Sequence, residues 1–146
     1  MSYAIDVNVL LYASDAGSPF SAAAKSFLKK CSSGPEVLCL GWPTLSSYLR
    51  LSTHPAVFRN PLTAEEAETN VESLLGLPHV RVLSEREGFW DVYREVTRGL
   101  AVRGNDVPDA HLAALLRQND VDTLYTNDRD FRKFGFLRIR NPFEEK

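Results

Sequence analysis

Five short apolar segments alternate with longer segments of helical periodicity, and this alternation limits the possible folds more than any other feature. The predicted strands are 2–6, 36–40, 80–84, 122–126 and a short edge strand at 137–142. Strands separated by helices along the whole chain are typical of a mostly parallel sheet with helices on both faces. We therefore predict one α/β domain over residues 1–146, with three layers (α/β/α) around a four- or five-stranded sheet.

Apolar spacing and boundary residues locate the helices between these strands. The segments predicted as helices are 7–14, 18–34, 42–53, 63–75, 87–104 and 107–119. Thr63 and Glu66 have the spacing of a capping box, and Pro43 suits a first helical turn.

Composition excludes several classes of protein. A formal net charge of -2 gives no overall basic bias towards nucleic acid, although local patches matter more than the sum. No apolar run approaches the roughly 18 residues of a membrane span, and Asp6 interrupts any secretory apolar region. The two cysteines, Cys31 and Cys39, lack C-x-x-C spacing and a nearby histidine, which argues against zinc. We expect buried, reduced thiols in a cytoplasmic protein.

Acidic residues follow the ends of several predicted elements. Asp6 ends the first strand, Asp109 lies in the first turn of a helix, and Asp128 and Asp130 follow the fourth strand. In parallel sheets, ligands bind beyond the carboxyl ends of the strands, where the strand order reverses. If the first and fourth strands are neighbours, these carboxylates meet. Their repulsion favours a bound divalent cation, and oxygen ligands favour magnesium or manganese.

Each acid also has a simpler explanation when it is taken alone. Asp109 can cap its helix, Asp128 and Asp130 can form an Asx-type turn, and Asp6 can pair with a buried arginine. Singly, these structural roles are the more common ones. Together, at element ends that the fold brings to one edge, the acids favour a metal site.

Four separated motifs, in order, resemble those of PIN-domain ribonucleases, and more narrowly the VapC-type toxins of bacterial toxin–antitoxin systems. They are "AIDVNVLLYA", "VPDAHLAAL", "LYTNDRDF" and "LRIRNPF", and the stretch "WPTLSSYLRLSTHPAVF" followed by "PLTAEEA" also fits. The resemblance covers nearly the whole chain. It implies a PIN-like fold, a magnesium-dependent endoribonuclease that is the toxin of a VapBC-like type II system, a homodimer, and a cognate antitoxin that blocks the site.

The resemblance also implies roles for particular residues. Asp6, Asp109 and Asp128 match the catalytic, metal-binding aspartates, while Asn8, Thr126 and Asp130 match supporting positions. On this basis we expect hydrolysis of RNA phosphodiester bonds by a metal-activated water, with Ser47, Thr126 and Asp130 supporting the ion less directly.

One position departs from the family pattern. The family usually carries a glutamate in the helix after the second strand, and that position is Ser47 here. A single magnesium ion still has three carboxylates, but a second ion would be held less well, and whether Asp106 substitutes is left open. The departure motivates an alternative function, a catalytically weak or silent module that binds RNA or an antitoxin.

Another enzyme class, aspartyl phosphotransfer, fits less well. Haloacid-dehalogenase-type phosphatases carry Asp-x-Asp-x-Thr after the first strand. Here the same positions read "DVNVL", so the second acid is Asn8 and the threonine is Leu10.

Basic and aromatic residues give weaker predictions. Arg50, Arg129 and Arg132 are candidates for contacts to RNA phosphates. Near Asp109, His111 points to a different helical face, so we expect a packing or surface role. The aromatic residues expected in the core, or in a dimer or antitoxin interface, are Trp42, Phe58, Trp90 and Tyr93, and Phe131 is expected in the core.

Overall fold

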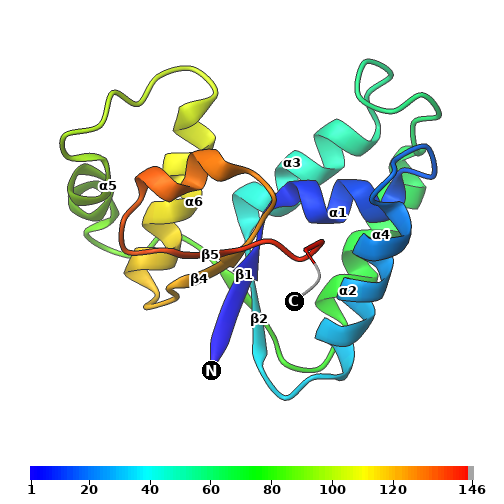
Figure 1. Ribbon diagram of the computed structural model, residues 1–146, viewed down its shortest axis with the longest axis horizontal. Coiled ribbons are helices and arrows are strands. Elements are labelled where there is room, and N and C mark those ends of the chain that lie inside the picture. The colour runs from blue at the N-terminus through cyan, green and yellow to red at the C-terminus, as the bar shows by residue number, and fades with distance from the viewer. Residues whose placement is uncertain (145–146) are drawn as a thin grey trace.

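The computed structural model describes residues 1–144 and contains one five-stranded parallel sheet (Figure 1). The strands are β1 (Ser2–Ile5), β2 (Val37–Gly41), β3 (Val80–Leu83), β4 (Thr123–Tyr125) and β5 (Arg138–Arg140). Their spatial order is β3-β2-β1-β4-β5, and every neighbouring pair is parallel. The predicted α/β class and the short edge strand at the end of the chain are confirmed.

Helices cover both faces of the sheet. They are α1 (Val7–Ser14), α2 (Ser21–Ser33), α3 (Trp42–Ser52), α4 (Ala64–Leu75), α5 (Phe89–Thr97) and α6 (Asp106–Gln118), and a 3-10 helix, η1 (Arg129–Lys133), follows β4. Figure 1 shows α5 and α6 on one side of the sheet and α1, α2 and α4 on the other. The predicted capping box is present at the start of α4, where Thr63 and Glu66 each bond the other's backbone N–H.

Two apolar cores lie on the two faces of the sheet because strand side chains alternate in direction. Tyr3, Ile5 and Leu38 belong to the core under α1 to α4, whereas Ala4 and Cys39 belong to the core under α6 and η1. Each core residue of the central strands is therefore covered by helices, which is why these strands are apolar throughout.

The strand order reverses between β1 and β4. From β1 the chain proceeds outward through β2 and β3, and then returns to the other side of β1 for β4 and β5. Ile5 is in register with Tyr125, and the Asp6 backbone N–H donates to the Tyr125 carbonyl over 3.1 Å. The residues that directly follow these two strands, Asp6 and Thr126, are thus brought together at the point where the topology predicts a ligand site.

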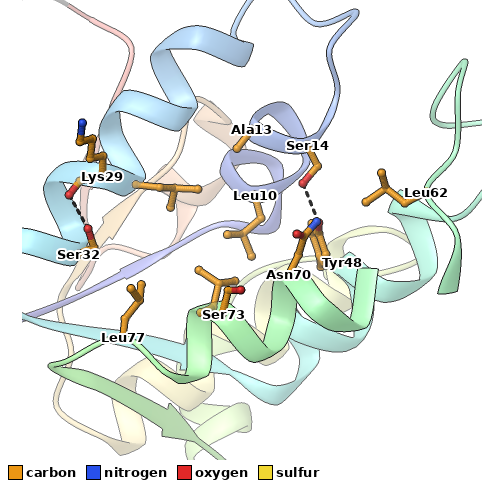
Figure 2. Close-up of a pocket in the computed structure, with 12 residues that line it drawn as sticks. Leu10, Ala13, Ser14, Lys29, Ser32, Tyr48, Leu62, Asn70, Ser73 and Leu77 are labelled. Carbon is orange, nitrogen blue, oxygen red and sulfur yellow. Dashed lines mark hydrogen bonds between the residues drawn. The ribbon is translucent and has the colours of Figure 1, made fainter. Parts of the chain in front are cut away.

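A hollow of ≈ 400 Å³ lies among α1, α2, α3 and α4 (Figure 2). Its lining is mostly apolar, with a small polar network inside. The Tyr48 hydroxyl lies 2.7 Å from Ser14 Oγ and accepts a hydrogen bond from Asn70 Nδ2 over 2.8 Å. None of the four candidate acids lines this hollow.

Two predictions about the α5 region and the aromatic residues are wrong. The helix predicted over 87–104 ends at Thr97, and Gly99 and Gly104 then adopt positive φ values of 78° and 57°, which a helix does not allow. Trp42 and Trp90 are 51% and 64% exposed, so the core prediction is wrong for these two residues, and their role in a dimer or antitoxin interface stays a prediction. Trp90 instead stacks on Tyr93 at the surface of α5, with ring centroids 5.6 Å apart.

Other core predictions are confirmed. Phe58 and Phe131 are buried, and Cys31 and Cys39 are buried free thiols. In the described part of the chain, no helix has the length and apolar character needed to cross a membrane.

Candidate metal and phosphodiester site

Asp6 and Asp128 are connected through the hydroxyl group of Thr126. Thr126 Oγ1 donates to Asp6 Oδ2 over 2.9 Å and accepts a hydrogen bond from the Asp128 backbone N–H over 3.0 Å. The threonine is 1% exposed and Asp6 is 6% exposed, so both groups are shielded from water. Because Thr126 uses its hydroxyl as donor and acceptor at once, it holds Asp6 Oδ2 and the backbone of Asp128 in a defined relation.

Asp128 also begins the 3-10 helix. Its Oδ1 accepts a hydrogen bond from the Asp130 backbone N–H over 2.9 Å, which is the helix-capping geometry of an Asx turn. Asp128 can therefore cap the helix and also bind a ligand, because the cap uses only its Oδ1. We call the set of Asp6, Asp109 and Asp128 the acidic edge.

The carboxyl groups of the acidic edge influence one another's protonation. The pKa of Asp6 is raised from its ordinary value of 3.8 to about 6, chiefly by burial and also by the Asp128 charge, against the lowering effect of the Thr126 hydrogen bond. Burial, followed by the charges of Asp6 and Asp128, likewise raises the pKa of Asp109 to about 6. Asp109, from the first turn of α6, is thus electrostatically coupled to both other acids.

Asp106 does not extend the acidic edge as a free carboxylate. It lies in the first turn of α6, and its Oδ1 forms an ion pair with Lys133 Nζ at 2.9 Å. The same ammonium group lowers the pKa of Asp109. The Lys133–Asp106 pair therefore ties η1 to the start of α6, and it joins the two elements that carry Asp128 and Asp109.

The donor chemistry of the acidic edge fits a hard divalent cation. Its members are oxygen donors, and their mutual repulsion is the kind that a cation relieves. As they lie, no three acidic, histidine or cysteine side chains within residues 1–144 converge closely enough to surround an ion on their own. Magnesium binds commonly through one or two carboxylates while it keeps several waters, so the arrangement suits magnesium better than a fully dehydrated ion.

The remaining predicted site residues lie at varying positions. Asn8 lies in the first turn of α1, Ser47 is half-buried in the middle of α3, and Arg50 is exposed near the end of α3. Arg129 and Arg132 are exposed on η1 and line a polar cavity of ≈ 250 Å³ with Thr126 and Asp128.

The cavity has further lining residues that the sequence did not single out: Phe20, Asn127, Ile139, Asn141 and Glu144. The only signal for Asn127 was its place inside "YTNDRDF". Ile139 and Asn141 lie inside the quoted motif "LRIRNPF", whereas Phe20 and Glu144 carried no local signal.

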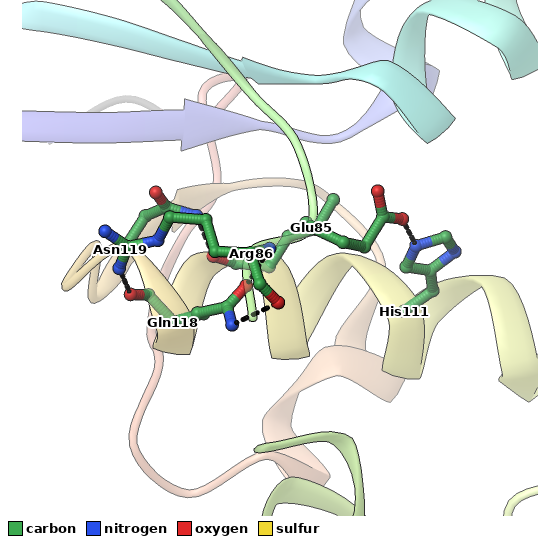
Figure 3. Close-up of polar contacts among 6 residues, drawn as sticks. Glu85, Arg86, His111, Gln118 and Asn119 are labelled. Atoms are coloured by element: carbon green, nitrogen blue, oxygen red, sulfur yellow. Dashed lines mark hydrogen bonds and ion pairs between the residues drawn. The ribbon is translucent and has the colours of Figure 1, made fainter. Parts of the chain in front are cut away.

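His111 makes packing and polar contacts outside the acidic edge, in agreement with the predicted packing or surface role. Its Nε2 lies 2.5 Å from Glu85 Oε1 (Figure 3). Its ring also packs edge-on against Phe89. In the same figure, Arg86 and Gln118 bond each other, the Gln118 Oε1 accepting from the Arg86 backbone N–H over 2.9 Å. These contacts attach the β3–α5 connection to α6, and they give His111 a structural role.

Comparison with known proteins agrees with this architecture. The family model described as "PIN domain" matches residues 3–137. The chain is 46% identical to ribonuclease VapC48 of Mycobacterium tuberculosis over 143 residues, which cover 98% of this chain and 99% of the relative. It is 34% identical to ribonuclease VapC43 of the same species over 140 residues, covering 96% of this chain and 95% of the relative.

Solved structures with the same fold are more distant in sequence. The sarcin–ricin loop cleaving toxin VapC20 of M. tuberculosis superposes with a TM-score of 0.67 at 22% identity, covering 94% of this chain and 98% of that chain. VapBC2 from Rickettsia felis, bound to a DNA fragment from its promoter, gives a TM-score of 0.68 at 17% identity, covering 97% of this chain and 98% of that chain.

A first prediction concerns the buried charge of Asp6. Because its pKa is higher in the folded protein than its ordinary value, the folded state binds more protons between about pH 4 and 6, and stability falls as pH rises through that window. In metal-free protein at pH 8, Asp6→Asn should therefore raise the free energy of unfolding by roughly 1–3 kcal/mol. Urea unfolding at pH 8 and pH 4 measures the effect, which should vanish at the lower pH.

The matched control is Asp91→Asn, an exposed acid in α5 that should change stability by less than about 0.5 kcal/mol at either pH. A destabilised or unchanged Asp6→Asn protein at pH 8 would contradict the assigned burial cost.

A second prediction concerns the Thr126 hydroxyl. Thr126→Val keeps the shape but leaves the Asp128 N–H and Asp6 Oδ2 without their partner, so it should cost about 1–3 kcal/mol. Thr126→Ser keeps both hydrogen bonds and loses one methyl group, worth about 0.8 kcal/mol. Chemical denaturation of the two variants compares them, and a serine variant as unstable as the valine variant would show that the hydroxyl is unimportant.

Proposed function

The chain belongs to the PIN-domain family, in its VapC group, and from this premise we propose that it is a magnesium-dependent endoribonuclease, the toxin of a toxin–antitoxin pair. The observation that supports this most directly is geometric: at the reversal of strand order, the Thr126 hydroxyl bonds both the Asp6 carboxylate and the Asp128 backbone N–H. The charges of Asp6 and Asp128 also raise the pKa of Asp109, which agrees with the three acids lying near one another. Relatives of matching length that are named ribonucleases support the RNA substrate.

In the proposed reaction, the acidic edge binds the cation and the arginines bind the RNA. Asp6, Asp109 and Asp128 hold the ion, directly or through water, and manganese is an alternative to magnesium. When bound, a divalent ion polarises a phosphate oxygen and lowers the pKa of the water that attacks phosphorus. Both raised pKa values lie near 6, so these acids are mostly ionised at neutral pH and available to a cation.

Other residues of the chain position these groups. Thr126 fixes one oxygen of Asp6, and Lys133 pairs with Asp106 and so offsets part of its negative charge, which still contributes to the raised pKa of Asp109. Exposed Arg129 and Arg132 offer guanidinium groups to the RNA backbone. We assign Asn8, Ser47 and Asp130 supporting roles through bound water.

We also propose a cognate antitoxin, a homodimer and a cytoplasmic location. The antitoxin is supported by structural neighbours that were solved as VapBC assemblies, such as VapBC-1 from nontypeable Haemophilus influenzae. The homodimer rests on the family resemblance described above.

The test of the enzyme is cleavage of RNA by purified, antitoxin-free protein in the presence of magnesium. We expect cleavage that a chelator abolishes. Asp6→Asn, Asp109→Asn and Asp128→Asn should each lower the rate at least about a hundredfold, since even residues that only orient metal ligands cost ten- to hundredfold. Asp91→Asn is the surface control and should cleave like the parent. Cleavage by Asp6→Asn at the parental rate would refute the assignment.

Ser47 keeps a second function open, a weak or silent PIN-fold module that binds RNA or antitoxin. It stands where the family usually has a glutamate, so one carboxylate is missing. Under the nuclease proposal, Ser47→Glu should lower the magnesium concentration needed for half-maximal cleavage, while Ser47→Gln, equal in size but uncharged, should not. RNA binding without cleavage by the parent and by Ser47→Glu would establish the binding module instead.

A further inference from the structure

The 3-10 helix η1 presents its side chains in three rows. A 3-10 helix has three residues per turn, so residues three apart lie above one another. Phe131 and Phe134 are buried in the core under α6, and Lys133 turns to Asp106. Arg129 and Arg132 form the remaining row, and both line the polar cavity beside the acidic edge. The helix geometry therefore aims two guanidinium groups into the same space.

Within residues 1–144, neither the Arg129 nor the Arg132 guanidinium group forms an ion pair with an acid. Asp128 and Glu144 also line the cavity, so the formal charges of its lining balance. A phosphate group is nevertheless a suitable partner for two guanidinium groups without ion pairs, because arginine binds phosphate through bidentate hydrogen bonds. The cavity therefore offers two such groups directly next to the acidic edge.

The rest of the lining suits a nucleoside better than a bare anion. Asn127 and Asn141 are half-buried and line the cavity. Their amide N–H groups make only long hydrogen bonds to the described residues, Asn127 Nδ2 to the Tyr12 hydroxyl over 3.3 Å and Asn141 Nδ2 to Glu144 Oε1 over 3.4 Å, and each NH₂ group has a second donor for the edge of a base. The Phe20 ring supplies an apolar wall, held in place by Tyr12 and Phe143 with ring centroids 5.0 Å away from each. Aromatic walls and amide groups together are typical of single-stranded RNA recognition.

The size of the cavity limits the ligand. Its volume of ≈ 250 Å³ is just below the range of about 300–1,000 Å³ that holds drug-sized molecules. The cavity therefore holds part of one nucleotide of a single strand, the rest of which projects into solvent, and a duplex does not enter it.

We propose that this cavity, bounded by Arg129, Arg132, Asn127, Asn141 and Phe20, is a subsite for one unpaired nucleotide that flanks the cleaved phosphodiester. The proposal rests on the proposed nuclease function and deepens it, because it names where the enzyme reads its substrate. Arg129 and Arg132 bind the phosphate, and Asn127 and Asn141 face the base edge. The carboxylate of Glu144, which also lines the cavity, repels the negatively charged RNA backbone.

The experiment measures RNA binding separately from cleavage. Two samples that should not cleave RNA are used: the parent protein in the presence of a chelator, and the Asp6→Asn protein with magnesium. Each sample is titrated with fluorescent oligoribonucleotides of each of the four bases and with an RNA duplex. We expect single strands to bind more tightly than the duplex. The double variant Arg129→Gln/Arg132→Gln should bind single strands at least about tenfold more weakly, because hydrogen bonds to charged groups are lost. Its salt dependence, log K against log[salt], should be shallower by about 0.7 for each phosphate contact removed.

Two further variants test the base and the rim. Asn141→Asp keeps the acceptor that binds the Phe143 N–H over 2.9 Å but replaces the amide donor, so it should change which base is preferred, in binding and at the cleavage position. Glu144→Gln should strengthen binding of every sequence. Arg98→Gln, an exposed arginine after α5, is the control and should bind like the parent.

The outcomes separate this proposal from the proposed function. Binding that responds to these variants, in a protein that never cleaves RNA, would support the subsite and refute the nuclease. Cleavage with unchanged affinity, salt slope and base preference in all variants would refute the subsite and leave the nuclease standing. Circular dichroism of each variant confirms folding, and Glu144→Gln, which is expected to gain affinity, cannot owe its result to misfolding.

Discussion

The site depends on the parallel pairing of β1 with β4. This pairing joins residues about 120 positions apart, and it sets Asp6 directly beside Thr126, whose hydroxyl then bonds both Asp6 and the backbone of Asp128. Without that register the carboxylates would be separate surface acids. With it, Asp6 is a buried carboxylate whose pKa is raised by burial and, less strongly, by the Asp128 charge, and this cost is a consequence of the register that brings it beside Thr126.

The 3-10 helix after β4 divides the neighbourhood of the acidic edge into different chemical regions. One row of side chains enters the core, one pairs with the start of α6, and one carries the arginines of the polar cavity. These five residues thereby have three roles. They contribute to the core, they link the start of α6, which carries Asp109, to the region of Asp128, and they supply positive charge near the acidic edge. Positive charge beside an acidic edge is what a metal-dependent enzyme acting on a polyanion requires, since the acids alone would repel it.

Much of the fold was predictable because the local signals within each element favour the same secondary structure. Apolar strands, helical periodicity and the Thr63–Glu66 capping box all point to the same boundaries. The helix beginning at Phe89 was predicted too long because its apolar spacing continues past Thr97, although Gly99 is a local stop signal. The exposure of Trp42 and Trp90 was decided by tertiary context, since nothing local says that they remain at the surface. The prediction of a sheet with helices on both faces succeeded because burial of the strands on both faces leaves a continuous apolar pattern.

For the site, the sequence by itself determined which acids follow which elements, and hence that Asp6, Asp109 and Asp128 would meet if the first and fourth strands were neighbours. Only the tertiary structure decided that these two strands are neighbours and that Thr126 connects Asp6 with Asp128. The ion pair between Lys133 and Asp106 was likewise decided there. The polar cavity also belongs to the tertiary structure, because Phe20, Asn127 and Asn141 come from three separate segments. Local sequence encodes the direction of a side chain within its element, whereas distances between elements depend on packing, register and charge, which no short segment contains.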